Sequence, residues 1–427
     1  EECAVLQGYT GFGGIPDILS LDSNDSTSAA VNQQFNVVLQ QLKKVLLIGV
    51  NNDQKLYKQL VKSIKSSSLT AFYTPKSLIT TLSYHIQQAF QQNNLPIRSF
   101  LEPSAGVGGF LPIASAETEK VAFEKDHVTG LILTALQPDT QVIVDGFETL
   151  DTKNLETKSY DIIASNIPFG NLKIYDAGFE QRGAPYTQAA KTIHNYFFFK
   201  AITQLKEGGI LAFITSRGVA DSPSNKFVRD YIVHNTNIIT ALRLPDNLFM
   251  QTAGIEVGSD LFILQKRTDK PMLTSREQLF LDVAKENVPN SSNKCEFANK
   301  LLMQPKYALA TESNIKTNQY GKYVRKYYWK DTETNMQLSF SQTLASDFSR
   351  YFNKNLIGKN PAEQPVKPLS LFDLFDNPGT PPAPVKQIKK ENIIYTHTVA
   401  PWMKQGTLVS FNQQIGTLHF KQDSLLD

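Results

Sequence analysis

An alternation of short apolar runs with longer amphipathic segments, between residues 69 and 265, constrains the fold more than any other feature of the sequence. Amphipathic segments at 75–91, 126–136 and 189–206 predict helices, and the last is expected to end at the Gly208-Gly209 stop signal. Apolar runs rich in Ile, Val and Phe with helices between them favour a doubly wound, mainly parallel sheet. Seven strands are predicted, at 99–101, 120–123, 141–144, 160–164, 210–214, 238–244 and 260–265.

The chain has 427 residues, which is enough for about two to four domains. Helical periodicity at 35–46 and 56–64 follows an early glycine cluster, and prolines gather between 361 and 384. The predicted regions are 1–68, helical and loop; 69–268, the α/β domain; 269–358, basic and aromatic; 359–390, a Pro-rich linker; and 391–427, a short β-like tail with a hairpin around Asn412-Gln413-Gln414.

Composition excludes several classes of protein. Hydrophobic residues make up 41% of the chain, which excludes a mostly disordered protein. Only Cys3 and Cys295 are present, which excludes a disulfide scaffold and a cysteine-based zinc site, and fits a reducing compartment. The longest apolar runs, at 45–50 and 210–215, are far shorter than the roughly 18 residues of a membrane span.

Charge is distributed unevenly along the sequence. The chain carries 43 Lys and Arg against 40 Asp and Glu, a net charge of +3 that neither requires nor excludes a polyanionic partner. Residues 265–330 hold 13 of the basic and 6 of the acidic residues, a surplus of +7, whereas the remainder sums to 30 against 34. If nucleic acid binds, this segment is the first expected contact.

Polar or glycine-rich signals follow each of the first three predicted strands, where an open parallel sheet binds its ligand. Residues 101–110 form a loop with three glycines, which allows a tight turn and close approach to a ligand, although ordinary strand-to-helix turns have the same composition. Glu124 follows the second strand and is suited to accept hydrogen bonds from ribose hydroxyls, or else it is a solvated charge or a helix cap. Asp145 follows the third strand and is suited to accept from an adenine amine, or else it is a turn residue.

The fourth strand is followed by Ser165, Asn166, Ile167, Pro168, Phe169 and Gly170. An amide side chain, a backbone carbonyl and an aromatic ring at one strand end are what a site needs to hold a planar amine. Two acceptors can take the two NH₂ protons, and the ring can stack on the base. The competing interpretation is an Asx-type turn with a buried Phe.

In this order the signals resemble the S-adenosylmethionine-dependent adenine-N6 DNA methyltransferases. Residues 242–249 and 258–264 further resemble type I modification subunits, and residues 71–75 and 193–197 resemble the methylase segments of large methylase–helicase proteins of bacterial mobile elements. The resemblance implies a Rossmann-like methyltransferase with a mixed, mainly parallel seven-stranded sheet, a helical N-terminal region and an α+β C-terminal extension. It implies a catalytic tetrapeptide at Asn166, Ile167, Pro168 and Phe169, and cofactor contacts at Thr74, Pro75, Glu102, Pro103, Ser104, Gly106, Gly108, Glu124, Lys125, Asp145, Gly146 and Phe147.

One position departs from the family pattern. The tetrapeptide usually has proline second, and here Ile167 takes that place. The family role of this residue is to offer its main-chain carbonyl to the adenine amine, and any residue has a carbonyl. The substitution therefore removes rigidity rather than an essential group.

The resemblance implies methyl transfer from S-adenosylmethionine to the 6-amino group of a flipped adenine, with no metal. Double-stranded DNA is the expected partner. Arg217 and Lys226 are weaker candidates for phosphate contacts, and His194 is expected to be structural. The main DNA contacts are predicted at Lys316, Lys322, Arg325, Lys326 and Lys330, which alternate with aromatic residues, and the alternative there is a half-buried strand with a solvated charged face.

Other functions remain open at this stage. The same tetrapeptide chemistry serves enzymes that methylate RNA or protein glutamine, and the fold also suits a non-catalytic DNA-binding module of a larger helicase or of a defence or anti-restriction protein. We expect a bacterial cytoplasmic location, no membrane association and a possible helicase or nuclease region or subunit as partner. Because position 1 is Glu, we also expect the sequence to be a portion of a longer protein.

Overall fold

A computed structural model describes residues 40–44, 47, 51–70, 73–153, 159–250, 254–318, 320–358, 408–411 and 414–417. The chain divides into two units, Glu1–Leu374 and Phe375–Asp427. Most of the described residues belong to the first unit. The predicted Pro-rich linker at 359–390 lies outside the described residues.

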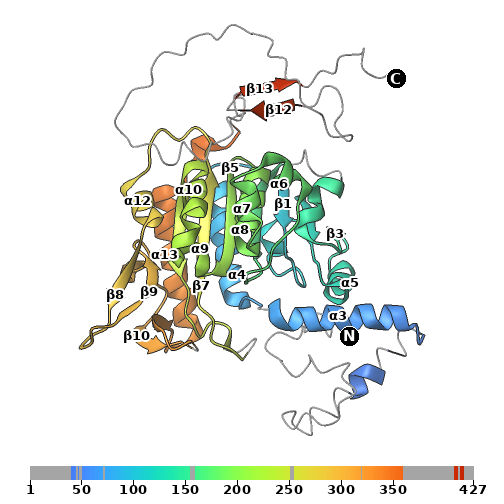
Figure 1. Cartoon of the computed structure of the whole chain (residues 1–427), viewed down its shortest axis with the longest axis horizontal. Helices are drawn as coiled ribbons and strands as arrows, with labels where there is room; N and C mark the ends of the chain where they lie inside the picture. The colour runs from blue at the N-terminus through green and yellow to red at the C-terminus, as the bar shows by residue number, and fades with distance from the viewer. Residues whose placement is uncertain are drawn as a thin grey trace, which may run out of the picture. The chain divides into compact units, whose positions relative to one another are not determined.

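The first unit is built on one seven-stranded sheet with the order β3-β2-β1-β4-β5-β7-β6 (Figure 1). All of its neighbouring strands run parallel except β7, which is antiparallel to both β5 and β6. The predicted mixed, mainly parallel sheet is confirmed. The strands are β1 Ser99–Glu102, β2 Glu119–Phe123, β3 Gln141–Ile143, β4 Tyr160–Asn166, β5 Leu205–Ser216, β6 Thr236–Arg243 and β7 Ser259–Lys266.

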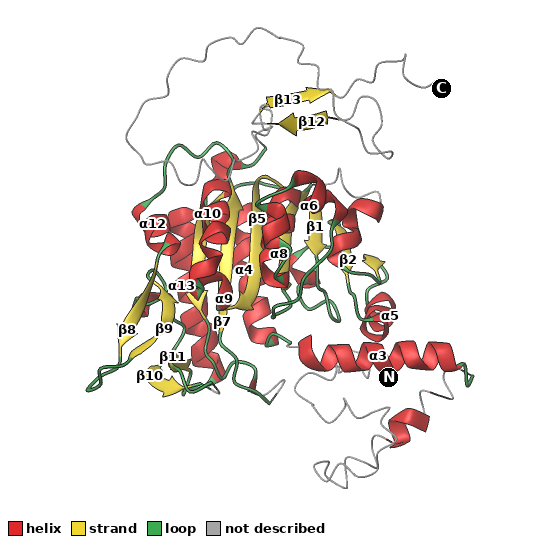
Figure 2. Ribbon diagram, in the orientation of Figure 1, coloured by secondary structure: helices red, strands yellow, loops and turns green. Residues whose placement is uncertain are grey.

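Helices cover both faces of the sheet (Figure 2). Alternate side chains of β5 enter two separate cores, with Leu211 and Phe213 on one face and Ile210 and Ala212 on the other. The first core is completed by α6 Ala177–Arg182, α7 Tyr186–Ala189, α8 Ile193–Gln204, α10 Lys226–Asn235 and α12 Ser275–Leu281. The second is completed by α4 Lys76–Gln91, α5 His127–Leu136 and α13 Glu333–Tyr351.

The predicted helices at 75–91, 126–136 and 189–206 correspond to α4, α5 and α8, but the expected stop at Gly208-Gly209 is wrong. Helix α8 ends at Gln204, and both glycines lie inside β5. Gly208 has φ +78°, and a Cβ there would lie 2.5 Å from the backbone carbon of Leu356. Glycine is therefore needed because another backbone segment, the 3₁₀ helix η6 at Lys354–Leu356, crosses close to the strand.

The chain after β7 folds back on the sheet. Two antiparallel pairs, β8 Val283–Asn287 with β9 Lys294–Asn299 and β10 Glu312–Thr317 with β11 Tyr323–Tyr328, precede α13. Helix α13 buries Met336, Phe340, Leu344 and Phe348, and it packs against α4 and β6. In the second unit, β12 Leu408–Phe411 pairs antiparallel with β13 Gln414–Thr417.

Two further helices complete the described first unit. Helix α3 spans Gln54–Thr70 and packs against α5 (Figure 1). The four-residue helix α9, Gly218–Asp221, follows β5. No helix within the described ranges combines the length and the apolar character needed to cross a bilayer.

Candidate active site

Three loops at the carboxyl edge of the sheet are joined by hydrogen bonds. The backbone N–H of Gly106, after β1, donates to Glu124 Oε2 after β2 at 2.8 Å. The hydroxyl of Ser165, at the end of β4, donates to the carbonyl oxygen of Ser104 at 2.8 Å. Polar groups that lie 18 and 61 residues apart in the sequence thus share one edge of the sheet, as a parallel topology requires.

The loop after β1 depends on its glycines. Gly106 has φ +55°, and a Cβ at this position would lie 3.1 Å from Cε1 of Tyr73. Gly108 has φ +85°, and a Cβ there would lie 2.7 Å from Leu111. Both backbone conformations favour glycine, so the loop is a tight turn that packs closely against Tyr73 and the core.

Glu102, the last residue of β1, is a buried acid with one oxygen available. Its Oε1 accepts a 3.2 Å hydrogen bond from the N–H of Phe110, while Oε2 is buried and has no hydrogen-bond partner among the described residues. Burial raises the pKa of Glu102 well above its usual range, and the nearby charge of Glu124 adds to the shift. A group that donates a hydrogen bond or carries positive charge would satisfy this oxygen.

Glu124 links the loops after β1 and β2. Its Oε1 accepts from the N–H of Asp126 at 2.7 Å, while its Oε2 holds Gly106. Burial raises the pKa of Glu124 to about 7, even though both hydrogen bonds oppose the shift. Its side chain is therefore poised between the neutral and ionised forms near neutral pH.

The predicted residues around β3 divide between the edge and the core. Asp145 lies two residues after β3, and its Oδ1 accepts from the N–H of Gly146 at 2.8 Å. The ring of Phe147 is buried in the core, 5.9 Å from the ring of Phe123, so a cofactor could contact this residue only through its backbone. Lys125 is exposed and forms an ion pair with Glu148.

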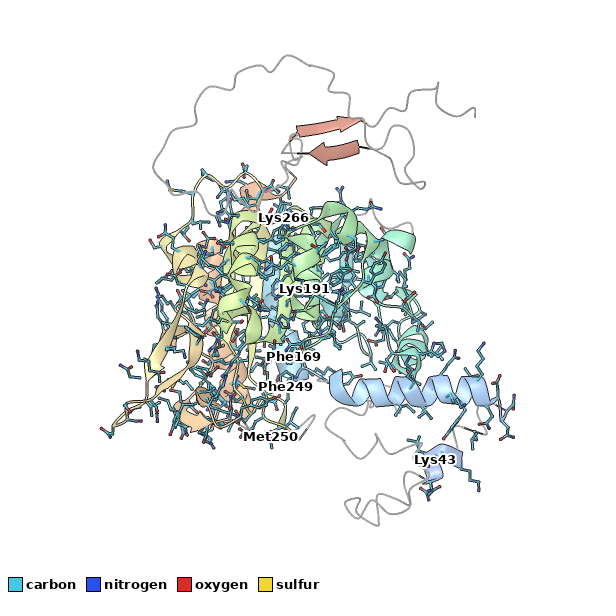
Figure 3. The ribbon with its side chains drawn as sticks, viewed as in Figure 1. Lys43, Phe169, Lys191, Phe249, Met250 and Lys266 are labelled. Atoms are coloured by element: carbon cyan, nitrogen blue, oxygen red, sulfur yellow. The ribbon has the colours of Figure 1, made fainter. Side chains whose placement is uncertain are left out.

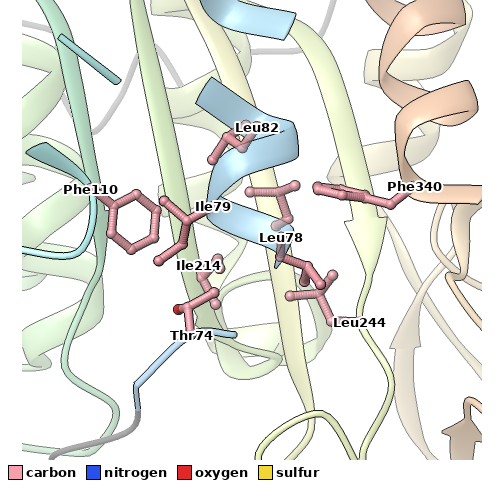
Figure 4. Close-up of a pocket in the computed structure, with 9 residues that line it drawn as sticks. Thr74, Leu78, Ile79, Leu82, Phe110, Ile214, Leu244 and Phe340 are labelled. Atoms are coloured by element: carbon pink, nitrogen blue, oxygen red, sulfur yellow. The ribbon is translucent and has the colours of Figure 1, made fainter. Parts of the chain in front are cut away.

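Thr74 and Pro75 lie where the chain enters α4. Pro75 is the N-cap residue of that helix. Thr74, whose hydroxyl is buried, lines a small apolar cavity together with Leu78, Phe110 and Phe340 (Figure 4). Its volume of about 10 Å³ has room for about one water molecule, so this cavity is not the cofactor site.

The predicted catalytic tetrapeptide begins at the last residue of β4. The N–H of Ile167 donates to the carbonyl oxygen of Ile214 at 3.0 Å, and the Ile167 side chain is buried in the core. Asn166 and Phe169 are half-buried, with Phe169 packed against the core at the lower edge in Figure 3. Gly170 follows with φ +137° in open space. The apolar side chain of Ile167 therefore anchors the loop where the family pattern has a proline.

His194 is a buried residue to which sequence reasoning gave only a structural role. It is the second residue of α8, and both of its ring nitrogens are buried. Burial lowers its pKa to about 4, opposed by the backbone of Gly170, so the ring lies close to the end of the tetrapeptide loop. Its neighbour Asn195 bonds Asn225, whose amide in turn donates to the carbonyl of Gly218.

Arg217, one of the weaker predicted phosphate contacts, has partners within the protein. Its Nη2 forms a 2.6 Å ion pair with Asp246, and its Nη1 donates to the carbonyl oxygen of Arg325. Asp246 Oδ2 also accepts from the N–H of Tyr327 at 2.7 Å. Arg217 therefore fastens β11 to the loop that follows β6. Lys226 pairs with Asp230 along α10.

The five predicted DNA-contacting cations lie on or beside the β10–β11 pair, and most are engaged within the protein. Arg325 forms an ion pair with Glu286, Lys322 lies 3.4 Å from Glu296, and Lys326 lies 3.2 Å from Glu256. Lys316 and Lys330 both lie over the ring of Tyr328. The segment 316–330 contains no acidic residue, but one glutamate each from β8, β9 and the loop after β6 pairs with three of its five cations in three dimensions.

The described residues contain no group of three or more His, Cys, Asp or Glu side chains that could hold a metal ion. The polar groups at this edge are carboxylates, an amide and backbone N–H groups. Such a set can hold an organic cofactor and an amine, but it offers no built centre for a cation within these ranges.

The sequence profile of the N-6 DNA methylase family matches residues 54–337, roughly two thirds of the chain. The chain belongs to this family. The match contains every strand of the seven-stranded sheet and the whole carboxyl edge described above.

The chain has low sequence identity to the following three proteins. "Defense against restriction protein B" of Escherichia phage P1 is 25% identical over 202 residues, which are 47% of this chain and 8% of the relative's length. The type I restriction-modification methyltransferase subunit of Streptococcus thermophilus is 19% identical, with a TM-score of 0.38 over 51% of this chain and 49% of that one. The type I restriction enzyme EcoKI M protein is 15% identical, with a TM-score of 0.36 over 73% and 81%.

Proposed function

We propose that this chain transfers a methyl group from S-adenosylmethionine to the 6-amino group of an adenine flipped out of duplex DNA. The observation that carries the proposal is the joining of three strand ends by the Gly106–Glu124 and Ser104–Ser165 hydrogen bonds. These bonds bring the Glu124 carboxylate and the loop that begins at Asn166 to one edge of the sheet, where folds of this type bind nucleotides. Membership of the N-6 DNA methylase family supports the general activity.

The residues at this edge fit the cofactor. Glu102 offers a buried oxygen without a hydrogen-bond partner among the described residues, suited to the ammonium group of the methionine part. Glu124 and its neighbour Lys125 would hold the ribose, and Asp145, Gly146 and the backbone of Phe147 would hold the adenine ring. The turn at 103–108, together with Thr74 and Pro75, would hold the methionine part. S-adenosylmethionine supplies the electrophilic methyl group on its sulfonium.

The residues after β4 would prepare the adenine amine. The amine is a weak nucleophile because its lone pair is delocalised into the ring. Asn166 Oδ1 and the carbonyl oxygen of Ile167 would accept its two protons, which favours a pyramidal nitrogen and stabilises the positive charge that develops there. Phe169 would stack on the base, with Pro168 stiffening the loop. The amine would take the methyl group from the sulfonium, whose sulfur would keep the electron pair of the broken S–CH₃ bond, and the methylated amine would then lose one proton to solvent.

The substrate adenine must leave its base stack to reach this edge, which costs a few kcal/mol that protein–DNA contacts offset. Phage P1 "Defense against restriction protein B" is much longer than this chain, and the printed names of other relatives are those of restriction-modification subunits. We therefore propose that the chain acts on bacterial DNA in the cytoplasm, beside a helicase or nuclease region or subunit.

Transfer of a labelled methyl group tests the function. The purified chain is incubated with methyl-labelled S-adenosylmethionine and unmethylated duplex DNA, and the DNA is digested to nucleosides. We expect N6-methyl-2′-deoxyadenosine as the labelled product. Label in RNA or protein glutamine would assign another substrate, whereas cofactor binding absent at millimolar concentration would indicate a DNA-binding module without catalysis.

A further inference from the structure

Helix α3 carries a row of lysines that the proposed site does not use. Residues 54–70 include Lys55, Lys58, Lys62 and Lys65 and no acidic residue. Lys55, Lys58 and Lys62 are all exposed. With 100° between successive residues of a helix, these three lie within an arc of about 60°. The row is therefore one face of the helix rather than a scatter of charges.

The opposite face of α3 packs against α5 and the loop after β2. Val61 and Ile64 are each 2% exposed. The hydroxyl of Ser63 donates to a carboxylate oxygen of Asp126 and accepts from the N–H of His127 at 3.0 Å. Asp126 lies two residues after Glu124 and caps α5, so α3 is fastened beside the loop after β2 (Figure 1). The lysine face consequently points away from the body of the protein at the catalytic edge.

The charges of α3 differ from those of the β10–β11 pair. Three of the five cations on that pair have glutamate partners. Lys55 and Lys58 form no ion pair within the described part of the chain. Lysines three and four residues apart repel one another along a helix, by a few tenths of a kcal/mol per pair. A regularly charged anion laid along this face would remove that repulsion, whereas the β10–β11 cations would first have to leave their partners.

We propose that the lysine face of α3, formed by Lys55, Lys58 and Lys62, binds the phosphate backbone of the DNA duplex that flanks the flipped adenine. The proposal rests on the proposed function, because it takes duplex DNA as the polyanion. Helix α3 then acts as a positioning element: its lysines bind phosphates while its Ser63 contact fixes their place relative to Glu124. It reads no sequence, because phosphate contacts carry none.

Salt dependence of DNA binding tests this surface without knowledge of the recognition sequence. The full chain is titrated with a fluorescent duplex of random sequence between 50 and 200 mM salt, and the slope of log K against log salt is measured. Each phosphate contact contributes a slope of about −0.9. Lys55→Gln with Lys58→Gln should make the slope shallower by about 1.8, so the loss of affinity across this salt range becomes about 12-fold smaller.

A matched pair of cations at the other edge of the sheet gives the control. Arg350 and Lys354 are exposed, next to Asn353, whose N–H donates to Gln265 near the end of antiparallel β7. Arg350→Gln with Lys354→Gln removes the same charge and should leave the slope unchanged. A calorimetric titration with S-adenosylmethionine should give the wild-type dissociation constant for both double variants, which shows that both are folded.

Several results would overturn the proposal. The first is a wild-type salt slope for the Lys55→Gln, Lys58→Gln variant, and the second is an equal change of slope in the control variant. The third is absence of duplex binding by the wild-type chain. The fourth is a change of slope that is seen with an RNA duplex but not with DNA. The labelled-methyl assay distinguishes failure of the proposed function from failure of this proposal. A wild-type chain that binds duplex DNA but methylates none refutes methyl transfer. A wild-type chain that methylates DNA, with no change of salt slope in the Lys55→Gln, Lys58→Gln variant, refutes only the role of α3.

Discussion

At the scale of single residues, the proposed role of Asn166 lies in catalysis and not in cofactor binding. Its amide oxygen is proposed to accept a proton of the adenine amine, so Asn166→Ala should lower the rate of methyl transfer by about 10²–10³-fold, as loss of a transition-state hydrogen bond does elsewhere. The dissociation constant of S-adenosylmethionine, measured by calorimetry, should stay at the wild-type value. Asn355 is an exposed residue of η6, and Asn355→Ala is the matched control. Wild-type turnover in the Asn166 variant would refute the mechanism.

The raised pKa of Glu124 leads to a prediction of how cofactor binding depends on pH. In its proposed ribose role the carboxyl group must be ionised to accept two hydroxyls, and burial raises its pKa to about 7 in the protein without cofactor. Below that pH a proton must leave first, so each further pH unit of acidification should weaken binding by up to about tenfold. Glu124→Gln should bind weakly and lack this component, so the difference between the two calorimetric pH profiles isolates the carboxyl group. Parallel profiles would remove Glu124 from the ribose role.

The same pKa shift has the opposite sign for stability without cofactor. The folded state holds the Glu124 proton more tightly than the unfolded chain does, because its pKa lies at about 7 rather than 4.5. This carboxyl group therefore lowers the free energy of unfolding as pH rises from about 4.5 to about 7. Urea denaturation over that range should show a smaller decline for Glu124→Gln than for the wild type, and equal declines would contradict the assignment.

At the scale of secondary-structure elements, Gly208 lets β5 and η6 approach each other. Gly208→Ala combines an unfavourable positive φ, worth about 1–2 kcal/mol, with overlap against the Leu356 backbone, worth about 1–3 kcal/mol more. Gly321→Ala, with φ +73° and open space around it, carries only the first cost. Chemical denaturation should therefore show a larger loss for the Gly208 variant. Equal losses would mean that η6 yields without cost.

The loop after β6 is predicted to hold β11 through Asp246. This carboxylate is buried, its partner Arg217 is 16% exposed, and it also accepts the N–H of Tyr327, so Asp246→Ala leaves a largely buried cation without its partner. We expect the free energy of unfolding to fall by about 3–5 kcal/mol. Asp269→Ala breaks the exposed pair with Arg267 and should cost less than about 1 kcal/mol. Similar losses in the two variants would contradict a structural role for the buried pair.

Local sequence patterns were sufficient for the seven strands and for the edge where polar residues gather. Apolar periodicity determines strands, and parallel topology places Glu102, Glu124 and Asn166 at one edge. The partners of Arg217 and Arg325 could not be predicted, because Asp246 and Glu286 lie 29 and 39 residues away in the sequence. The role of Gly208 was missed for the same reason, since its neighbour Leu356 belongs to a distant segment.

At the scale of the whole molecule, the two units predict where the chain can be shortened. A chain that ends at Leu374 keeps the complete first unit, so its Tm and its affinity for S-adenosylmethionine should equal those of the full chain. A chain that ends at Asp331 lacks α13 and exposes the apolar surface that Phe340, Leu344 and Phe348 cover, so it should unfold at a lower temperature. Calorimetric melting distinguishes the two, and equal melting temperatures would show that α13 contributes nothing.

The reversed direction of β7 has a consequence for how such a molecule can diversify. Because β7 runs against β6, the connection between them, residues 244–258, turns on the same side as the tetrapeptide loop. That connection carries Asp246 and Glu256, which hold β11 and its neighbours. One inverted strand thus gives the tetrapeptide side of the sheet an additional loop. Under the proposed function, insertions and substitutions in this loop change the DNA side of the site and leave the residues proposed to hold the methyl donor intact.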